Sequence, residues 1–371
     1  MMIKLTHPYI SSDEILAVTE VMQTGMLVQG AKVQQFEQNL AAFMQANLVS
    51  VVSSGTAALH LALVALELGK GDAIIAPAFT FPATVNVIEL VGAKPILVDV
   101  SSDNYNMDPR QLEEVIRTWT GPEKLKAIMV VHEFGAPADM VEIVNIAKKH
   151  GLYVIEDAAC ALGTISNGQH VGCIGDIGCF SWHPRKSITT GEGGAIVVKD
   201  SHLYQKINIL RNHGIQKLED GSVDFVAPGF NYRLTEFQAV MGDLQLRRFQ
   251  NNIEKRKHLV EIYAKELSLV QHIVLPKMID GHSWQTFMIV LNDQYDRGKV
   301  IKSLAEKGIE SNLGAQAIHM MTYFKEKYGY DKDQFPNARL LYEKGLALPL
   351  HPLLTEDEIT FISLSLREVL T

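Results

Sequence analysis

Short apolar runs alternate with segments of helical periodicity between about residue 48 and residue 200. The runs are almost continuously apolar, as expected of strands that are buried on both faces of a sheet. Strands are predicted at Leu48–Val52, Ala73–Ala76, Pro95–Val100, Ala127–Val131 and Leu152–Ile155. Helices are predicted between them, around Ala57–Leu63, Val85–Leu90, Leu112–Ile116 and Asp139–His150. This alternation predicts an α/β fold with a mostly parallel sheet sandwiched by helices.

The pattern changes after Asn231. One long helical stretch is predicted from about Thr235 to Leu267, and it becomes rich in charge beyond Arg247. The remainder of the chain alternates helices and short strands. We therefore expect a large domain over residues 1–245 and a smaller C-terminal α+β domain over residues 246–371.

Composition and net charge exclude several classes of binding partner. The net charge of −8 leaves no broad basic face for nucleic acid or an anionic membrane. No apolar stretch approaches the ~20 residues that a membrane helix requires, and the N-terminus does not read as a signal peptide. The 3 cysteines are too few for a disulfide framework and lack a paired metal spacing. We expect a cytoplasmic protein with no metal, nucleic-acid or membrane partner.

The segment Cys179–Gly194 is the most informative about chemistry. An apolar run ends at Ser181, Lys186 follows five residues later, and a Thr-Thr-Gly-Glu-Gly-Gly turn comes next. Enzymes that bind pyridoxal phosphate (PLP) need a lysine that reaches the cofactor aldehyde and a hydroxyl near the phosphate. The lysine must be neutral to react, so either burial or loss of its proton on binding is required. The competing interpretation is a solvated surface lysine.

Two further segments follow predicted strands. Ser54-Gly55-Thr56 opens a helix whose N-terminal N–H groups suit a phosphate, although an ordinary helix cap would use the same residues. Asp157 ends a strand and could pair with the cofactor's pyridine nitrogen, or it could cap the next turn. Because ligands of parallel sheets bind at the carboxyl ends of the strands, we expect Lys186 and these residues to share one site.

In these motifs the chain resembles the DegT/DnrJ/EryC1/StrS aminotransferase family, which has the aspartate aminotransferase fold (fold type I). The matching segments run almost from end to end. They are Gly25–Gly30, Ser54–Leu59, Pro77–Thr84, Glu156–Ala159, the Lys186 segment and Asn231–Arg233. The resemblance implies a PLP-dependent sugar aminotransferase that works as a homodimer with a shared active site.

The resemblance also implies residue roles. Lys186 would bind the cofactor covalently and move protons, and Asp157 would pair with the pyridine nitrogen. Gly55, Thr56 and Ser181 would bind the phosphate, together with Asn231 of a second subunit. Phe81 would stack on the cofactor ring, and Cys160 would lie near the ring hydroxyl. The implied substrate contacts are Arg233 and His319; His183, three residues before the lysine, is a further candidate. Cys160 departs from the family, which usually has Gln or His there.

The implied reaction moves an amino group from L-glutamate to a nucleotide-linked keto-sugar in amino-sugar biosynthesis. The Thr189–Gly194 turn resembles that of family members acting at the sugar 4-position more than the 3-position. The segment Leu313–His319 lacks the proline that is common in the family's substrate loop, which leaves the identity of the sugar open. Three alternatives remain: a sugar dehydratase, an aminotransferase for a cyclitol or other cyclic ketone, and a non-catalytic PLP-binding regulator. Dehydratases of this fold carry histidine where this chain has Lys186.

Overall fold

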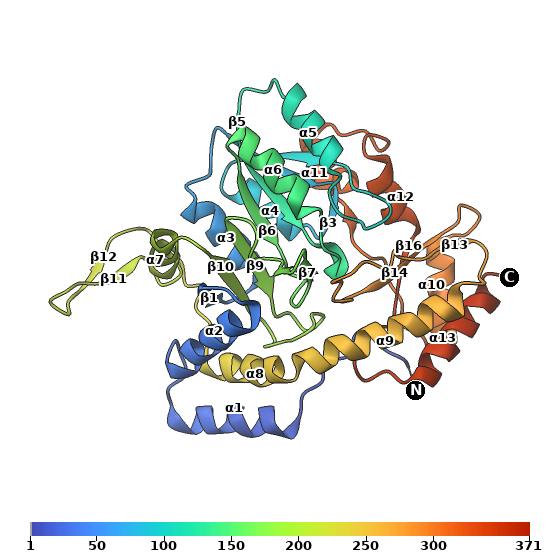
Figure 1. Cartoon of the computed structure of the whole chain (residues 1–371), viewed down its shortest axis with the longest axis horizontal. Coiled ribbons are helices and arrows are strands. Elements are labelled where there is room, and N and C mark those ends of the chain that lie inside the picture. The colour runs from blue at the N-terminus through green and yellow to red at the C-terminus, as the bar shows by residue number, and fades with distance from the viewer. Residues whose placement is uncertain (1) are drawn as a thin grey trace.

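The computed structural model describes residues 2–371 and has a seven-stranded sheet at its centre (Figure 1). The strand order is β1-β10-β9-β6-β5-β2-β4. Within this sheet β10 runs antiparallel to its two neighbours, and the other paired strands are parallel. The strands are β1 (Leu48–Val52), β2 (Asp72–Pro77), β4 (Lys94–Val98), β5 (Lys124–Val131), β6 (Tyr153–Asp157), β9 (Ile177–Ser181) and β10 (Gly194–Val198). The predicted mostly parallel sheet is confirmed.

Helices cover both faces of the sheet, so both faces are buried. Along β5, Ala127 and Met129 pack into one core cluster, whereas Ile128 and Val130 pack into another. This arrangement explains why the strands are almost continuously apolar. The first face is covered by α3 (Gly55–Ala65), α4 (Ala83–Leu90) and α7 (Ser201–Leu210). The second is covered by α2 (Ala31–Met44), α5 (Pro109–Thr118), α6 (Met140–His150) and α8 (Glu236–Arg247).

The C-terminal part of the chain builds a core of its own. Its antiparallel sheet has the order β13-β14-β16 and packs against α9, α10 and α13. Figure 1 shows both chain ends on the side of the molecule where this unit lies. The bounds are β13 (Ile273–Val274), β14 (Phe287–Leu291), β16 (Gly345–Leu348), α9 (Phe249–Leu267), α10 (Arg297–Glu306), α11 (Thr322–Tyr328), α12 (Pro336–Lys344) and α13 (Glu356–Val369).

The helical stretch predicted from about Thr235 to Leu267 is confirmed, but it is divided at one residue. The chain forms two helices, α8 and α9, with Arg248 between them at φ −101° and ψ 4°. No proline or glycine marks the break. Arg248 is instead held by the Glu14 carboxylate and the Tyr9 carbonyl, contacts to a segment more than 200 residues away. The predicted domain boundary at residues 245/246 falls just before this break and stays a prediction.

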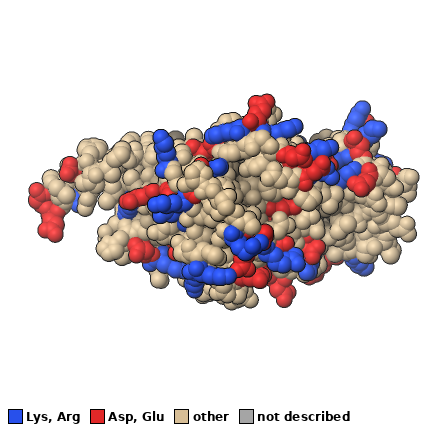
Figure 2. Space-filling model, turned by 90° about the horizontal axis from the view of Figure 1, so that it is seen from above, with Lys and Arg blue, Asp and Glu red and all other residues tan. Residues whose placement is uncertain are grey.

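Smaller elements complete the chain. The hairpin of β11 (Ile215–Lys217) and β12 (Val223–Phe225) projects from the end of the molecule opposite the chain ends (Figure 1). Figure 2 shows acidic side chains at that projecting end and both signs of charge mixed over the rest of the visible face. The remaining elements are α1 (Ser12–Thr24), the pairs β3 (Phe79–Thr80) with β15 (Gln316–Ala317) and β7 (Ile165–Ser166) with β8 (Gln169–His170), and the turns η1 (Glu133–Gly135) and η2 (Ile318–Met320). Within residues 2–371, none of the helices combines the length and apolar character needed to span a bilayer.

Candidate active site

The carboxyl ends of three parallel strands, β1, β6 and β9, meet at one cavity of about 400 Å³. A volume of this size is within the usual range for small-molecule sites. Eight of the predicted site residues line it: Gly55, Thr56, Phe81, Asp157, Cys160, Ser181, His183 and Lys186. A smaller cavity of about 250 Å³, lined by Met44, His170 and Lys199 among others, contains none of the predicted residues.

The start of α3 has the features of a phosphate site. Ser54 caps the helix, because its Oγ accepts the N–H of Ala57 at 3.0 Å. The cap leaves the N–H groups of Gly55 and Thr56 at the cavity, where the helix dipole favours an anion. A Cβ atom on Gly55 would lie 2.7 Å from the Cβ of Ser181, so only glycine lets the Ser181 hydroxyl approach this turn. The cap interpretation and the phosphate interpretation are therefore compatible.

Asp157 lies at the floor of the cavity and is buried. Its Oδ2 accepts the Thr84 hydroxyl at 2.8 Å, and its Oδ1 accepts the N–H of Ala159 at 3.1 Å. Burial raises the pKa of Asp157 above its ordinary value, although these two hydrogen bonds and the charge of Lys186 act in the opposite direction. The carboxyl group is fixed in place and acts as an acceptor on both oxygens.

The loop that carries Lys186 is held from two sides. The side chain of Gln245 in α8 bonds both the N–H and the carbonyl of Thr189, at 2.9 and 2.8 Å. From the C-terminal unit, Nε2 of Gln285 donates to the carbonyl of Arg185 at 2.7 Å. These contacts give a loop without regular secondary structure a defined backbone position, and with it the lysine.

Lys186 and Cys160 contact each other directly. The lysine Nζ donates a hydrogen bond to the cysteine Sγ at 2.9 Å. Burial raises the pKa of the Cys160 thiol, so Cys160 is a neutral acceptor near pH 7. Burial also lowers the pKa of Lys186, but the contact with Cys160 and the charge of Asp157 outweigh it, and the pKa lies above its ordinary value. The structure therefore favours loss of the lysine proton on cofactor binding over neutralisation by burial alone.

Three predicted residues do not line this cavity. His319 is fully buried, with its Nε2 3.1 Å from the Lys332 carbonyl and its ring against Phe335. Arg233 donates from Nη1 to Oδ1 of Asn212 at 2.8 Å. Asn231 is exposed in the segment that follows the β11–β12 hairpin. The substrate roles of His319 and Arg233, and the second-subunit role of Asn231, stay predictions.

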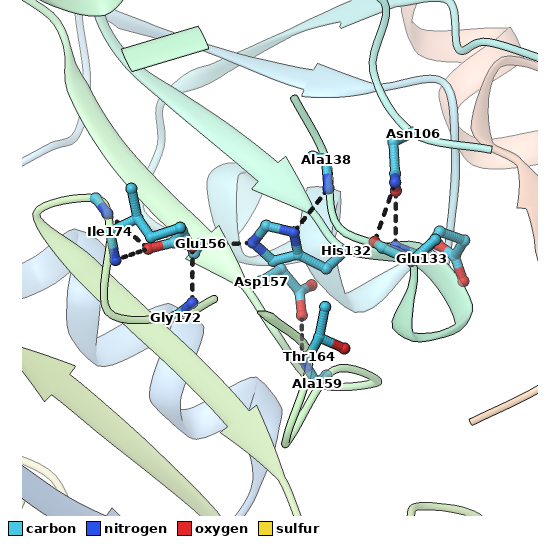
Figure 3. A network of polar contacts seen from close by, with 12 residues as sticks. Asn106, His132, Glu133, Ala138, Glu156, Asp157, Ala159, Thr164, Gly172 and Ile174 are labelled. Atoms are coloured by element: carbon cyan, nitrogen blue, oxygen red, sulfur yellow. Dashed lines mark hydrogen bonds and ion pairs between the residues drawn. The ribbon is translucent and has the colours of Figure 1, made fainter. Parts of the chain in front are cut away.

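Two polar residues that follow β5, His132 and Glu133, were not among the predicted site residues. His132 is buried and reaches Oε2 of Glu156 at 2.9 Å, while the Glu156 carboxylate accepts the N–H groups of Gly172, Ile174 and Gly175 (Figure 3). The next residue, Glu133, points away from that pair and lines the cavity. The strand-end rule that selected Asp157 would also have pointed to Glu133, which lies two residues after the end of β5, a parallel neighbour of β6.

Comparison with known proteins agrees with this geometry. The sequence profile of the DegT/DnrJ/EryC1/StrS aminotransferase family matches residues 8–367. The spore coat polysaccharide biosynthesis protein SpsC of Bacillus subtilis is 33% identical over 379 residues, which cover 98% of this chain and 95% of SpsC. The chain belongs to the DegT/DnrJ/EryC1/StrS aminotransferase family. Its resemblance to this family is thus confirmed.

Solved structures of other aminotransferases have the same fold as this family member. Spr1654 of Streptococcus pneumoniae, described as a sugar aminotransferase, superposes in its pyridoxamine-phosphate form with a TM-score of 0.93 at 29% identity, covering 99% of each chain. Helicobacter pylori PseC, an aminotransferase of pseudaminic acid biosynthesis, gives 0.93 at 26% identity, covering 100% of this chain and 99% of PseC. The predicted fold type I is confirmed.

The residues of this aminotransferase fit the PLP cofactor that its family implies. A structure of Spr1654 in its PLP form superposes with a TM-score of 0.92. In this chain an anion site at α3, a buried carboxyl acceptor and a lysine amine all face one cavity. They match the phosphate, the pyridine nitrogen and the aldehyde of PLP. The prediction of a PLP-dependent aminotransferase is confirmed.

Proposed function

We propose that this enzyme transfers an amino group from L-glutamate to a keto-sugar carried on a nucleotide, with the sugar 4-position as the favoured site. One observation carries the proposal: Lys186, Asp157 and the N-terminus of α3 line the same cavity. PLP, when bound, supplies an electron-withdrawing ring that carries the amino group between donor and acceptor. Loss of either Lys186 or Asp157 would have favoured a dehydratase or a regulator, and both are present.

The protein's own groups have distinct tasks in this proposal. Gly55, Thr56 and Ser181 bind the phosphate and orient the ring. Asp157 would pair with the pyridine nitrogen of the bound cofactor, which would keep the ring electron-poor. Lys186 would hold the cofactor aldehyde, and its Nζ would be the group that moves a proton during the reaction. Phe81, with 55% of its surface exposed, is free to cover the ring.

The substrate class rests on the outer part of the cavity and on the relatives. Beyond the cofactor residues, the cavity lining includes three amide side chains from the C-terminal unit, Gln285, Asn312 and Gln316, beside apolar residues such as Leu313 and Leu348. Amide groups of this kind can donate to and accept from the hydroxyls of a sugar. The relatives SpsC and PseC belong to polysaccharide and pseudaminic acid biosynthesis. These observations support a pathway that makes amino sugars for surface polysaccharides.

We also propose a homodimer in which Asn231 completes the phosphate site of the partner. Asn231 is exposed and lies outside the cavity of its own chain. The adjacent hairpin projects from the molecule and exposes Val223, Phe225 and Val226 by 58%, 69% and 47%. Exposed apolar side chains grouped in this way are typical of a protein interface.

The 3 free cysteines support a cytoplasmic location.

The test is the visible absorbance of the PLP-loaded protein before and after L-glutamate is added. The wild-type protein should show bound-cofactor absorbance that glutamate removes, and a nucleotide-linked keto-sugar should restore it. Lys186→Ala should abolish turnover and the covalent cofactor absorbance, a loss of at least about 100-fold in rate. The matched control is Lys199→Ala, which changes a lysine near the second cavity.

Absorbance that does not respond to glutamate would overturn the choice of donor. Restoration by a free cyclitol but not by any nucleotide-linked sugar would overturn the choice of acceptor. Comparing keto groups at the sugar 3- and 4-positions on the same nucleotide tests the positional preference.

A further inference from the structure

Arg185 is a charged residue of the cavity lining, next to Lys186 in the chain, and it is exposed. Within residues 2–371, these two residues are the only lysine or arginine that line the cavity. Three carboxyl groups line it as well, those of Glu133, Asp157 and Glu192. None of the ion pairs within residues 2–371 includes Arg185. Its guanidinium group can therefore pair with an anionic ligand.

Hydrogen bonds hold the backbone of Arg185 in place. Its N–H donates to Nδ1 of His183 at 3.2 Å, and its carbonyl accepts from Nε2 of Gln285 at 2.7 Å. The N–H of Lys186 donates to the carbonyl of His183 at 2.7 Å, which closes the turn His183-Pro184-Arg185-Lys186. The guanidinium group therefore extends from an anchored backbone, one residue from the amine that reacts.

The ring of His183 adds a neutral donor to the same turn. Its Nδ1 accepts the N–H of Arg185, so Nε2 carries the proton of the neutral ring. Burial lowers the pKa of His183, and the positive charge of Arg185 lowers it further. The charges of Glu192 and Lys186 act on this pKa in opposite directions. His183 is therefore neutral near pH 7, and the turn offers the cavity one charged donor and one neutral donor.

The two substrates carry anionic groups at different distances from the reacting carbon. L-Glutamate has one carboxylate on the carbon that bears the amine and a second at the end of its side chain. In a nucleotide-linked acceptor the phosphates lie beyond the sugar ring. Cα atoms of neighbouring residues are about 3.8 Å apart, so Arg185 is placed for the nearer anions, those of the donor. Lys186 contacts Cys160 inside the cavity whereas Arg185 is exposed, so the outer, side-chain carboxylate is the one that meets Arg185.

We propose that Arg185 binds the side-chain carboxylate of the amino donor, with Nε2 of His183 as a second donor, and so selects a dicarboxylic amino acid. The proposal rests on the proposed function, in which an amino acid gives its amine to the cofactor held by Lys186. A guanidinium group suits this task because it can bind both oxygens of a carboxylate with two parallel N–H···O bonds. An amino acid with an apolar side chain leaves the guanidinium group without a partner, and this loss discriminates against it.

The decisive experiment is calorimetric titration of the PLP-loaded protein with glutarate and with pentanoate. Both have the carbon chain of glutamate and no amine, and only glutarate has a second carboxylate. The wild-type protein should bind glutarate at least about tenfold more tightly than pentanoate, and Arg185→Gln should remove this preference. The matched control is Arg117→Gln, an exposed arginine of α5 outside the cavity, which should keep the preference. A wild-type protein without the preference, or an Arg185→Gln variant that keeps it, overturns the proposal.

A second measurement separates binding of this carboxylate from other roles of the turn. L-Norvaline has the carbon chain of L-glutamate but no side-chain carboxylate. In single-turnover reactions of the PLP-loaded protein, Arg185→Gln should raise the apparent Kd for glutamate by about 10- to 100-fold and leave the limiting rate within about threefold. The reaction with norvaline should also stay within about threefold, and Arg185→Lys should recover part of the affinity for glutamate.

Two other outcomes overturn the proposal. Equal losses with glutamate and norvaline would assign Arg185 to the carboxylate beside the amine or to the position of the lysine. A loss confined to the reaction with a nucleotide-linked keto-sugar would assign it to the phosphates. Because binding of glutarate requires no turnover, it can fail while the glutamate reaction of the proposed function succeeds, or the reverse.

Discussion

Residue by residue, the site combines groups that differ mainly in charge state. Lys186 has a pKa above its ordinary value, Cys160 is a neutral acceptor, and Asp157 accepts on both oxygens. Glu133 adds a carboxyl group whose pKa is about 8. In the cofactor-free cavity Lys186 is therefore a cation, and binding of an aldehyde must remove a proton from the lysine.

The raised pKa of Glu133 makes a prediction about stability and pH. Between the ordinary value of 4.5 and about 8, the folded protein keeps a proton that the unfolded chain has released. Stability from this group is complete below the ordinary value and is lost as the pH rises through the folded pKa, by up to about 1.4 kcal/mol per unit. Glu133→Gln does not titrate, so its melting temperature relative to wild type should rise from pH 5 to pH 9.

Scanning calorimetry of the cofactor-free proteins at matched ionic strength measures this difference. Glu133→Leu, which also does not titrate, should show the same trend from a lower starting stability. A difference that does not change with pH would mean that Glu133 is ionised in the folded state.

Among the elements, the loop between β9 and β10 depends on its neighbours for its position. Gln245 of α8 satisfies the N–H and the carbonyl of Thr189, and both groups are buried with it. Gln245→Leu leaves both backbone groups without a partner, so we expect a loss of about 2 to 4 kcal/mol in stability. Hydrogen exchange at Ser187–Gly191 should speed up, and PLP should dissociate faster.

The control for this prediction is Gln250→Leu, which changes an exposed glutamine at the start of α9. Its hydrogen exchange in the loop and its PLP retention should match the wild type. If both variants release PLP at the same rate, the contact between α8 and the loop does not position Lys186.

At the level of the whole molecule, the projecting hairpin is the feature that a single chain does not explain. Phe225 pairs with Ile215 at the base of the hairpin and Val226 follows it, and their surfaces are 69% and 47% exposed. Phe225→Asp combined with Val226→Asp should convert the proposed dimer to a monomer in sedimentation velocity. Activity should fall with it, because Asn231 would no longer reach a partner's phosphate site.

Phe361→Asp is the matched control, since Phe361 is an exposed aromatic residue on α13, far along the chain from the hairpin, with 47% of its surface exposed. It should leave the sedimentation coefficient unchanged. A double hairpin variant that remains dimeric and active would rule out the hairpin as the interface.

The sequence by itself determined the α/β fold, the alternation of strands and helices, and the residues that follow the ends of β1, β6 and β9. It could do so because burial on both faces of a sheet produces continuous apolar strands, and because parallel strands bring their carboxyl ends to one edge. Gly55, Asp157, Ser181 and Lys186 were found in this way, and all four line the cavity.

Only the tertiary structure decided the break at Arg248, the contact between Lys186 and Cys160, and the hydrogen bonds that join Thr80, Thr84 and Asp157. Arg248 ends a helix through a partner more than 200 residues away, which leaves no local signal. Whether these buried oxygens face one another depends on the packing between β3, α4 and the end of β6. Periodicity records which residues are buried, but the protonation of a buried group depends on its neighbours in space.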